Sequence, residues 1–156
     1  MTQKQAEMQW NAAKVEIAER KAALKLSFAA DQAAAQEDKR RAFAKYDTER
    51  NDALKDKQEF VEKLHELKRR GLAEWSEDID AQRRLIANCD KQLRDAKTAY
   101  MEKVREVDIV LRDMRIKFES DIAAIKADGK RQQAEIFSQI EKSEKPTNPD
   151  GENVSE

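Results

Sequence analysis

Apolar side chains recur at steps of three and four residues along the second half of this chain. One stripe runs through Leu72, Trp75, Ile79, Gln82, Ile86, Cys89, Leu93, Ala96, Tyr100, Val104, Val107, Leu111, Met114, Phe118, Ile122 and Ile125. Its mean step of about 3.53 residues is close to the 3.5-residue repeat of a left-handed coiled coil. The second half is therefore predicted to be a coiled-coil helix, with Cys89 as a small buried side chain in the apolar seam.

The first half carries a looser stripe of apolar residues, formed by Phe43, Tyr46, Phe60, Leu64 and Leu67. Arg50 and Lys57 interrupt it at seam positions. Long basic side chains can lay their apolar stems along a partner helix while the charged heads stay in water. The first half is therefore also predicted to be a helix that packs along one face.

Gly71 is the first glycine of the chain and lies between these halves. A lone glycine costs a helix only about 1 kcal/mol relative to alanine, so the neighbouring residues decide its role. Three cations, Lys68, Arg69 and Arg70, precede it where the last carbonyls of a helix would point. Ser76 with the acidic residues 77 and 78 supplies a cap and first turn for a new helix. These signals predict a turn near Gly71.

A helical wheel at about 100° per residue shows two segments with two apolar faces, residues 10–33 and 107–127. In the first, one face holds Trp10, Ile17, Leu24 and Phe28, and the opposite face holds Val15, Ala18, Ala22, Leu26, Ala29 and Ala33. In the second, Ile109 and Ile116 lie away from the main stripe. The segments are symmetric about position 69, so a turn at Gly71 would bring them side by side.

The predicted fold is all-α: an elongated antiparallel helical hairpin, or coiled coil, with a disordered C-terminal tail. Its arms span about 2–70 and 72–128, and a helix break at Asp128 and Gly129 leads to a short helix at about 130–142. Residues 143–156 contain two prolines, one glycine and few apolar residues, which is typical of disorder. The alternative is one continuous parallel coiled coil.

The amino-acid composition is that of a long helical protein and restricts where the protein is expected to be located. Charged residues make up 40% of the 156 residues, with three glycines and two prolines, as in long helical proteins. The net charge of −1 does not favour wrapping of nucleic acid. No apolar run is long enough to span a bilayer or to serve as a signal peptide. We therefore expect a cytoplasmic protein, or one packaged into a larger assembly from the cytosol.

Candidate chemistry is sparse. Glu62 and His65 have the spacing of a di-iron motif, but the chain has a single histidine. We expect no catalytic residue, no metal and no cofactor. A basic cluster at the turn could touch phosphates, although acidic residues share this region. Its members are Lys68, Arg69, Arg70, Arg83 and Arg84.

An arm of a two-helix hairpin needs only one apolar face, so the extra faces predict a partner. We expect a homo-oligomer or a contact with another helical protein, through Trp10, Ile17, Leu24, Phe28, Ile109 and Ile116. The predicted function is a non-enzymatic structural or assembly protein, a scaffold, adaptor or spacer, comparable in shape only to phage scaffolding proteins and secretion stalks. The alternative is a nucleic-acid-associated coiled coil that uses the basic cluster.

Overall fold

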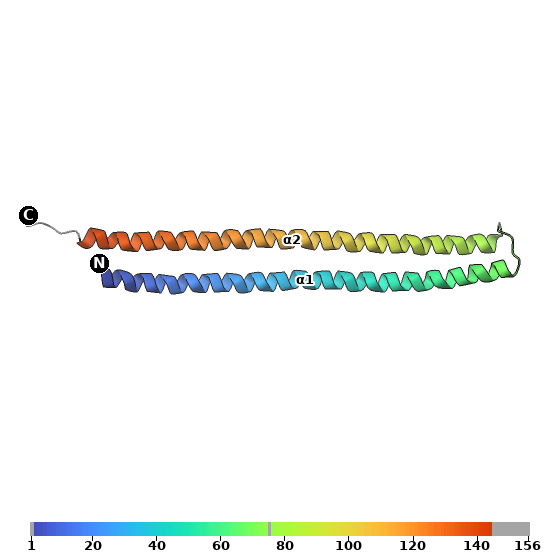
Figure 1. Ribbon diagram of the computed structural model, residues 1–156, viewed down its shortest axis with the longest axis horizontal. Helices are drawn as coiled ribbons and strands as arrows, with labels where there is room; N and C mark the ends of the chain where they lie inside the picture. The colour runs from blue at the N-terminus through green and yellow to red at the C-terminus, as the bar shows by residue number, and fades with distance from the viewer. Residues whose placement is uncertain (1, 75, 145–156) are drawn as a thin grey trace, which may run out of the picture. The chain divides into compact units, whose positions relative to one another are not determined.

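Two long helices make up nearly all of the described chain. The computed structural model describes residues 2–74 and 76–144, with side chains as far as residue 140. Helix α1 spans Gln3–Arg69 and helix α2 spans Glu77–Glu144. They form an all-α antiparallel two-helix hairpin, as predicted (Figure 1).

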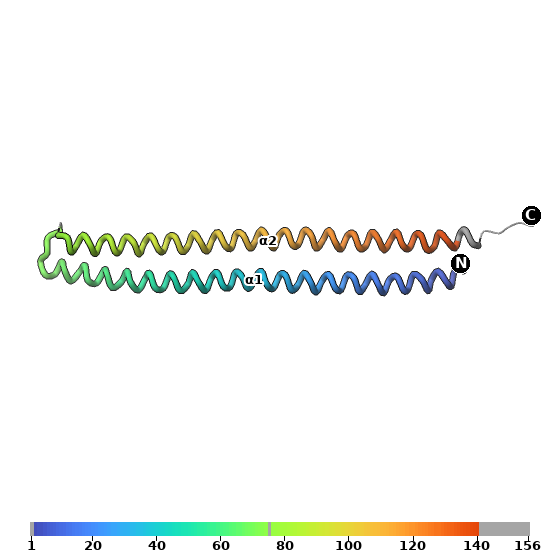
Figure 2. The backbone as a smooth tube through the Cα atoms, turned by 180° about the vertical axis from the view of Figure 1, so that it is seen from behind, coloured from blue at the N-terminus to red at the C-terminus, as the bar shows by residue number. Residues whose placement is uncertain are grey.

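The hairpin divides into two compact units. Unit 1 comprises residues 1–31 and 113–156, and unit 2 comprises residues 32–112 and includes the turn. Within each unit a segment of α1 lies antiparallel beside a segment of α2, and Figures 1 and 2 show this from opposite sides. Each unit therefore has its own apolar seam. Among the described residues, neither helix contains an apolar stretch suited to crossing a membrane.

The spacing of the buried positions differs between the units. In unit 2 the seam of α2 includes Ile79, Ile86, Leu93 and Tyr100, a seven-residue repeat. In unit 1 the seam of α1 includes Ala6, Ile17 and Phe28, which are spaced eleven residues apart. The buried or half-buried residues of this segment are Ala6, Trp10, Ala13, Ile17, Lys21, Leu24 and Phe28. An eleven-residue repeat has about 3.67 residues per turn and relaxes the left-handed supercoil that heptads impose.

Gly71 ends α1 in the way its sequence context predicts. The glycine has φ of 84°, the left-handed region in which a side chain would be strained. The Gly71 N–H donates to the Lys68 carbonyl at 3.0 Å, and the Leu72 N–H donates to the Leu67 carbonyl at 3.3 Å. This pair of bonds is the Schellman motif, which satisfies the last carbonyls of a helix. The predicted turn is confirmed.

Ser76 caps the start of α2. Its hydroxyl accepts a hydrogen bond from the Ile79 N–H at 3.3 Å, and its carbonyl accepts one from the Asp80 N–H at 3.0 Å. Glu77, Asp78 and Asp80 place negative charge in the first turn, where the helix dipole favours it. The connection is short because each helix end is capped by its own nearest residues.

The predicted helix break at Asp128 and Gly129 is wrong. Helix α2 continues through both residues to Glu144, so residues 130–144 are not a separate helix. Gly129 is buried, and a Cβ built there would lie 2.9 Å from Cδ1 of Ile17. The Asp128 carboxylate receives a hydrogen bond from Arg20 of α1 at 3.1 Å. The glycine therefore does not end α2; it lets Ile17 of α1 pack closely against α2 at this position.

The predicted disordered tail falls mostly beyond the described part of the chain. Residues 143 and 144 belong to α2, and residues 145–156 lie outside the described residues. The prediction is wrong for residues 143 and 144, because the helix continues through them, and it stays a prediction for residues 145–156.

Candidate interaction surfaces

Four of the six residues predicted to contact a partner lie in the seam of unit 1. Trp10, Ile17, Leu24 and Phe28 are half-buried and occupy the face of α1 that packs on α2. Phe28 stacks on Phe118, with ring centroids 4.5 Å apart and planes inclined by 17°. Their apolar surface is therefore used within the chain, and a role in partner binding stays untested.

The second apolar face of α1 remains exposed in unit 1. Met8, Val15 and Leu26 are 64%, 60% and 73% exposed. At about 100° per residue they point roughly 160° away from the seam. We call this face the outer stripe; its apolar members are Met8, Val15, Ala18, Ala22, Leu26 and Ala29. Large apolar side chains aligned on one exposed face indicate a surface for contact, whereas single exposed ones do not.

Ile109 and Ile116 are the two predicted residues that are exposed. Ile109, in unit 2, is 42% exposed, and Ile116, in unit 1, is 58% exposed. Within unit 1, exposed Ala123 and Ala127 continue the face of α2 that carries Ile116. Helix α2 of unit 1 therefore also presents an apolar face away from its seam.

The basic cluster at the turn is largely paired with carboxylates. Arg70 pairs with Glu66 at 3.2 Å, and Arg84 lies 3.8 Å from Asp80. Among the described residues, four of the five predicted cations have such pairs; the fifth is Arg69. This pairing reduces the positive charge that the cluster could offer to phosphates.

Glu74 connects the two ends of the turn. Lys68 lies 3.5 Å from its carboxylate, and Arg83 donates to both its carboxylate and its carbonyl, the latter at 3.3 Å. Arg83, followed by Lys68, lowers the pKa of this carboxyl. Two of the predicted nucleic-acid residues are thus engaged by one carboxylate.

Cys89 is buried in the seam of unit 2, as predicted, with 3% of its surface exposed. Burial raises the pKa of its thiol, and the carboxylates of Asp56 and Asp90 raise it further. Because the thiolate is the nucleophile, a raised pKa makes Cys89 a poor one.

The raised thiol pKa predicts a pH-dependent stability. The contribution of Cys89 to the free energy of unfolding should be fully present below the pKa of an unfolded thiol, about 8.5. It should be lost as pH rises through the pKa of the thiol in the folded chain. The difference in urea midpoint between wild type and Cys89→Ala should therefore be smaller at about pH 10 than at about pH 7. An equal difference at both pH values would contradict the assignment. Circular dichroism of both chains provides the measurement.

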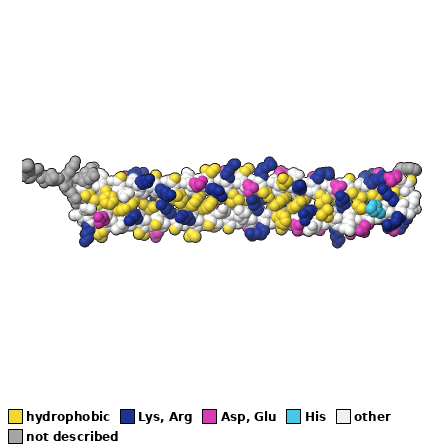
Figure 3. Space-filling model, viewed as in Figure 1, with side chains coloured by type: hydrophobic (Ala, Val, Ile, Leu, Met, Phe, Trp, Pro, Cys, Tyr) yellow, Lys and Arg dark blue, Asp and Glu magenta, His cyan; other side chains and the backbone are white. Residues whose placement is uncertain are grey.

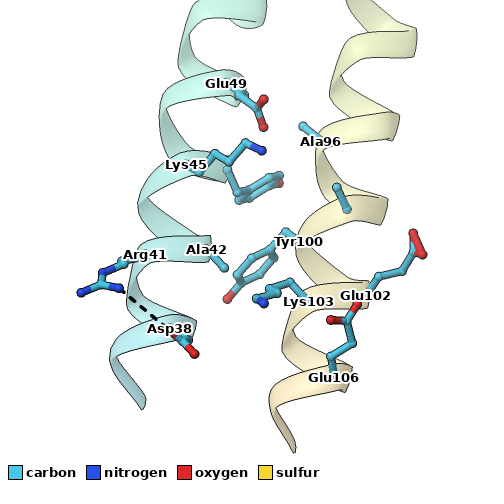
Figure 4. Close-up of a pocket in the computed structure, with 12 residues that line it drawn as sticks. Asp38, Arg41, Ala42, Lys45, Glu49, Ala96, Tyr100, Glu102, Lys103 and Glu106 are labelled. Carbon is cyan, nitrogen blue, oxygen red and sulfur yellow. Dashed lines mark ion pairs between the residues drawn. The ribbon is translucent and has the colours of Figure 1, made fainter. Parts of the chain in front are cut away.

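A groove runs between the helices along one side of unit 2. It has a volume of ≈ 560 Å³, and an adjoining hollow shares Lys45, Glu49, Ala96 and Ala99 with it. Figure 4 shows Ala42 and Ala96 on facing helices, with Tyr100 between them. We call this feature the alanine groove, because its floor is formed by Ala42, Ala53, Ala96 and Ala99.

The groove is deep because the alanine side chains of its floor are short. Tyr46 and Tyr100 stack beneath it, with ring centroids 5.1 Å apart and planes inclined by 14°. Its rim is predominantly acidic, with seven carboxylates against the three cations Arg41, Lys45 and Lys103. The acidic residues are Asp38, Glu49, Asp52, Asp56, Asp95, Glu102 and Glu106. The groove is therefore an acidic channel with a narrow apolar floor.

The opposite side of unit 2 is basic. The helical wheel places four acidic residues there, Asp47, Asp80, Asp90 and Asp108, against ten basic ones. We call it the basic side; its cations are Lys39, Arg40, Arg50, Lys57, Lys68, Arg83, Arg94, Lys97, Arg105 and Arg112. Figure 3 shows the face that carries His65, where Lys and Arg outnumber Asp and Glu.

Two ion pairs join the helices on the basic side. Lys39 lies 2.5 Å from Asp108, and Lys57 lies 2.7 Å from Asp90. Arg50, at a predicted seam position, is exposed and lies over the Tyr46 ring at 5.7 Å from its centroid. Within the described residues, Arg94, Lys97 and Arg105 have no ion pair. Positive charge thus remains available on this side.

No family model, no curated protein and no solved structure matches this chain. Within the described residues, no cluster of three or more His, Cys, Asp or Glu side chains could hold a metal ion. Three surfaces of the molecule are therefore candidates for a function: the outer stripe, the alanine groove and the basic side.

Proposed function

We propose that this chain is a non-enzymatic structural or assembly protein of the cytoplasm that works through protein–protein contacts. The observation that supports this most is the outer stripe of unit 1. Its large side chains, Met8, Val15 and Leu26, project from a helix whose opposite face is already packed. A helix that only had to form this hairpin would need one apolar face.

The outer stripe has the spacing that another helix requires. Val15, Ala18, Ala22, Leu26 and Ala29 recur at steps of three and four, so they align along one side of α1. The alanines let a partner helix approach closely, and the larger side chains would fill gaps on that helix. Full burial of a Val or Leu side chain contributes about 1.5–3 kcal/mol. The partner in this proposal is a second copy or another helical protein.

Charged substitutions in the outer stripe test the proposal. In Val15→Glu/Leu26→Glu, any oligomer that this face maintains should dissociate, because two carboxylates would have to be buried at the contact. The helicity should stay unchanged, since both positions are exposed. Light scattering reports the mass and circular dichroism reports the helix content. Ile109→Glu/Ile116→Glu probes the exposed face of α2 by the same measurements.

The matched control is Gln9→Glu/Ser27→Glu. It adds the same two charges to α1 of unit 1, at exposed positions off the stripe. It should leave the mass unchanged. If the stripe variant and the control have equal masses at all concentrations, the outer stripe is not an assembly surface.

Association with nucleic acid is a second proposal, supported by the basic side of unit 2, where Lys68 and Arg83 lie. Neutralising phosphates releases counterions, so such binding should weaken steeply as salt rises. It predicts a salt-sensitive mobility shift with DNA or RNA that Arg94→Ala/Lys97→Ala weakens. Arg69→Ala/Arg70→Ala tests whether the cations at the turn take part. A shift that these substitutions leave unchanged would remove the turn cluster from the proposal.

A further inference from the structure

Unit 2 carries opposite charge on its two sides. The alanine groove has seven acidic and three basic rim residues, and the basic side has ten basic and four acidic ones. From this complementarity we infer that the alanine groove of one chain receives the basic side of a second copy. The inference deepens the proposed function by naming the partner, and it uses a surface distinct from the outer stripe.

The basic side carries apolar side chains that the groove could accommodate. Phe43 is 51% exposed, Leu54 is 46% exposed and Met101 is 56% exposed. They project from the side of unit 2 opposite the groove, whose floor of alanines leaves space between the helices. In knobs-into-holes packing, a side chain of one helix fits into a space between side chains of another. Phe43, Leu54 and Met101 would be the knobs, and the alanine groove would supply the holes. The two sides therefore complement each other in shape as well as in charge.

The knobs and the groove occupy the same stretch of unit 2. Lys39 lies opposite Asp108 and Lys57 opposite Asp90, so the register of the two helices is constant between these pairs. The groove extends over residues 38–56 of α1, and Phe43 and Leu54 lie within that range. A second copy stacked in the same orientation would place its knobs over the groove without sliding along it.

Stacking of this kind joins two different surfaces, so it does not close at a dimer. A heterologous contact between copies in the same orientation repeats and produces open-ended growth. Nineteen residues of helix extend about 28 Å, and two helices are about 20 Å wide. Each contact then covers roughly 500 Å² per partner, less than the ~800 Å² of a typical stable interface. Growth should therefore require high protein concentration and weaken as salt rises.

The test uses two chains, each with the charge of two side chains reversed. The first, Asp52→Lys/Asp95→Lys, makes the groove rim more basic, and the second, Arg94→Glu/Lys97→Glu, makes the basic side more acidic. Each alone should weaken concentration-dependent growth in sedimentation velocity, because the new side chains face like charges on the next copy. An equimolar mixture should recover it, because the lysines introduced in the groove of one chain then face the glutamates introduced on the basic side of the other. The full-length chain is used throughout.

Glu59→Lys/Glu62→Lys is the control, because it makes the same charge change outside the groove; it should grow like the wild type. The outer-stripe variant Val15→Glu/Leu26→Glu separates the two proposals. Its loss of growth, with the groove variants unaffected, would retain the proposed function and overturn the stacking. Failure of the mixture to recover growth would overturn it equally. So would loss of duplex DNA binding by Arg94→Glu/Lys97→Glu without a change in mass.

Discussion

Replacing Ile79 with alanine should lower the free energy of unfolding by about 2–4 kcal/mol. Ile79 is the largest side chain that the described residues bury completely, with no exposed surface. The seam of a two-helix hairpin is one residue thick, so few neighbours can move in to fill the cavity. The cost should therefore include both the lost transfer free energy and the cavity.

Urea unfolding followed by circular dichroism measures this change. Leu85→Ala is the control, because Leu85 is on the same helix but 37% exposed, and it should cost less than about 1 kcal/mol. The cap of α2 should persist in Ile79→Ala, since it uses the main-chain N–H of that residue. Equal losses for the two variants would mean that the start of α2 is not packed as described.

Replacing Gly129 with leucine should destabilise the chain, although intrinsic helix propensity predicts the opposite. Leucine improves helix propensity over glycine by about 1 kcal/mol. A Cβ at this position would meet Cδ1 of Ile17 at 2.9 Å. Rotation of that terminal methyl could accommodate alanine, but a leucine side chain overpacks the seam at a cost of about 1–3 kcal/mol. We expect a net loss of up to about 2 kcal/mol.

The sign of the effect decides between close packing and simple propensity. Ala127→Leu is the control, because residue 127 is exposed on the same helix and should change stability by less than about 0.5 kcal/mol. Adding Ile17→Ala to Gly129→Leu should recover part of the loss, since it removes the side chain in the way. Stabilisation by Gly129→Leu alone would show that the two helices do not approach closely there.

The turn could be predicted because its signals are local. Cations before Gly71 and a serine with acidic residues after it act within one helical turn, so no knowledge of the partner helix is required. The role of Gly129 could not be found in this way. What determines it is Ile17, 112 residues earlier in the chain, and a glycine beside an aspartate otherwise resembles a helix end.

The helical wheel identified two apolar faces on α1 but not which of them packs inside the chain. Trp10 and Phe28 mark one face and Val15 and Leu26 the other, with similar hydrophobicity. The packing of Phe28 on Phe118 and of Ile17 beside Gly129 identifies the seam. On α1, the surface left for partners therefore consists of residues that the sequence did not rank first.

The charge separation of unit 2 is encoded in the sequence, but a count of charged residues in successive segments does not show it. Basic and acidic residues nearly balance in every long segment, so the net charge of −1 suggests no asymmetry. Sorting the same residues around the helix axis requires the direction of the seam on both helices. Once the seam is known, Lys97 and Asp95, two residues apart, fall on opposite sides.

The most direct test of assembly is the mass of the wild-type chain in solution as a function of its concentration. Sedimentation equilibrium at low and high salt would measure it against the monomer mass of 18.0 kDa. We predict a mass above this value that rises with concentration, and a smaller rise at high salt. A mass of one chain at every concentration and salt would contradict assembly with its own copies through the outer stripe and the alanine groove.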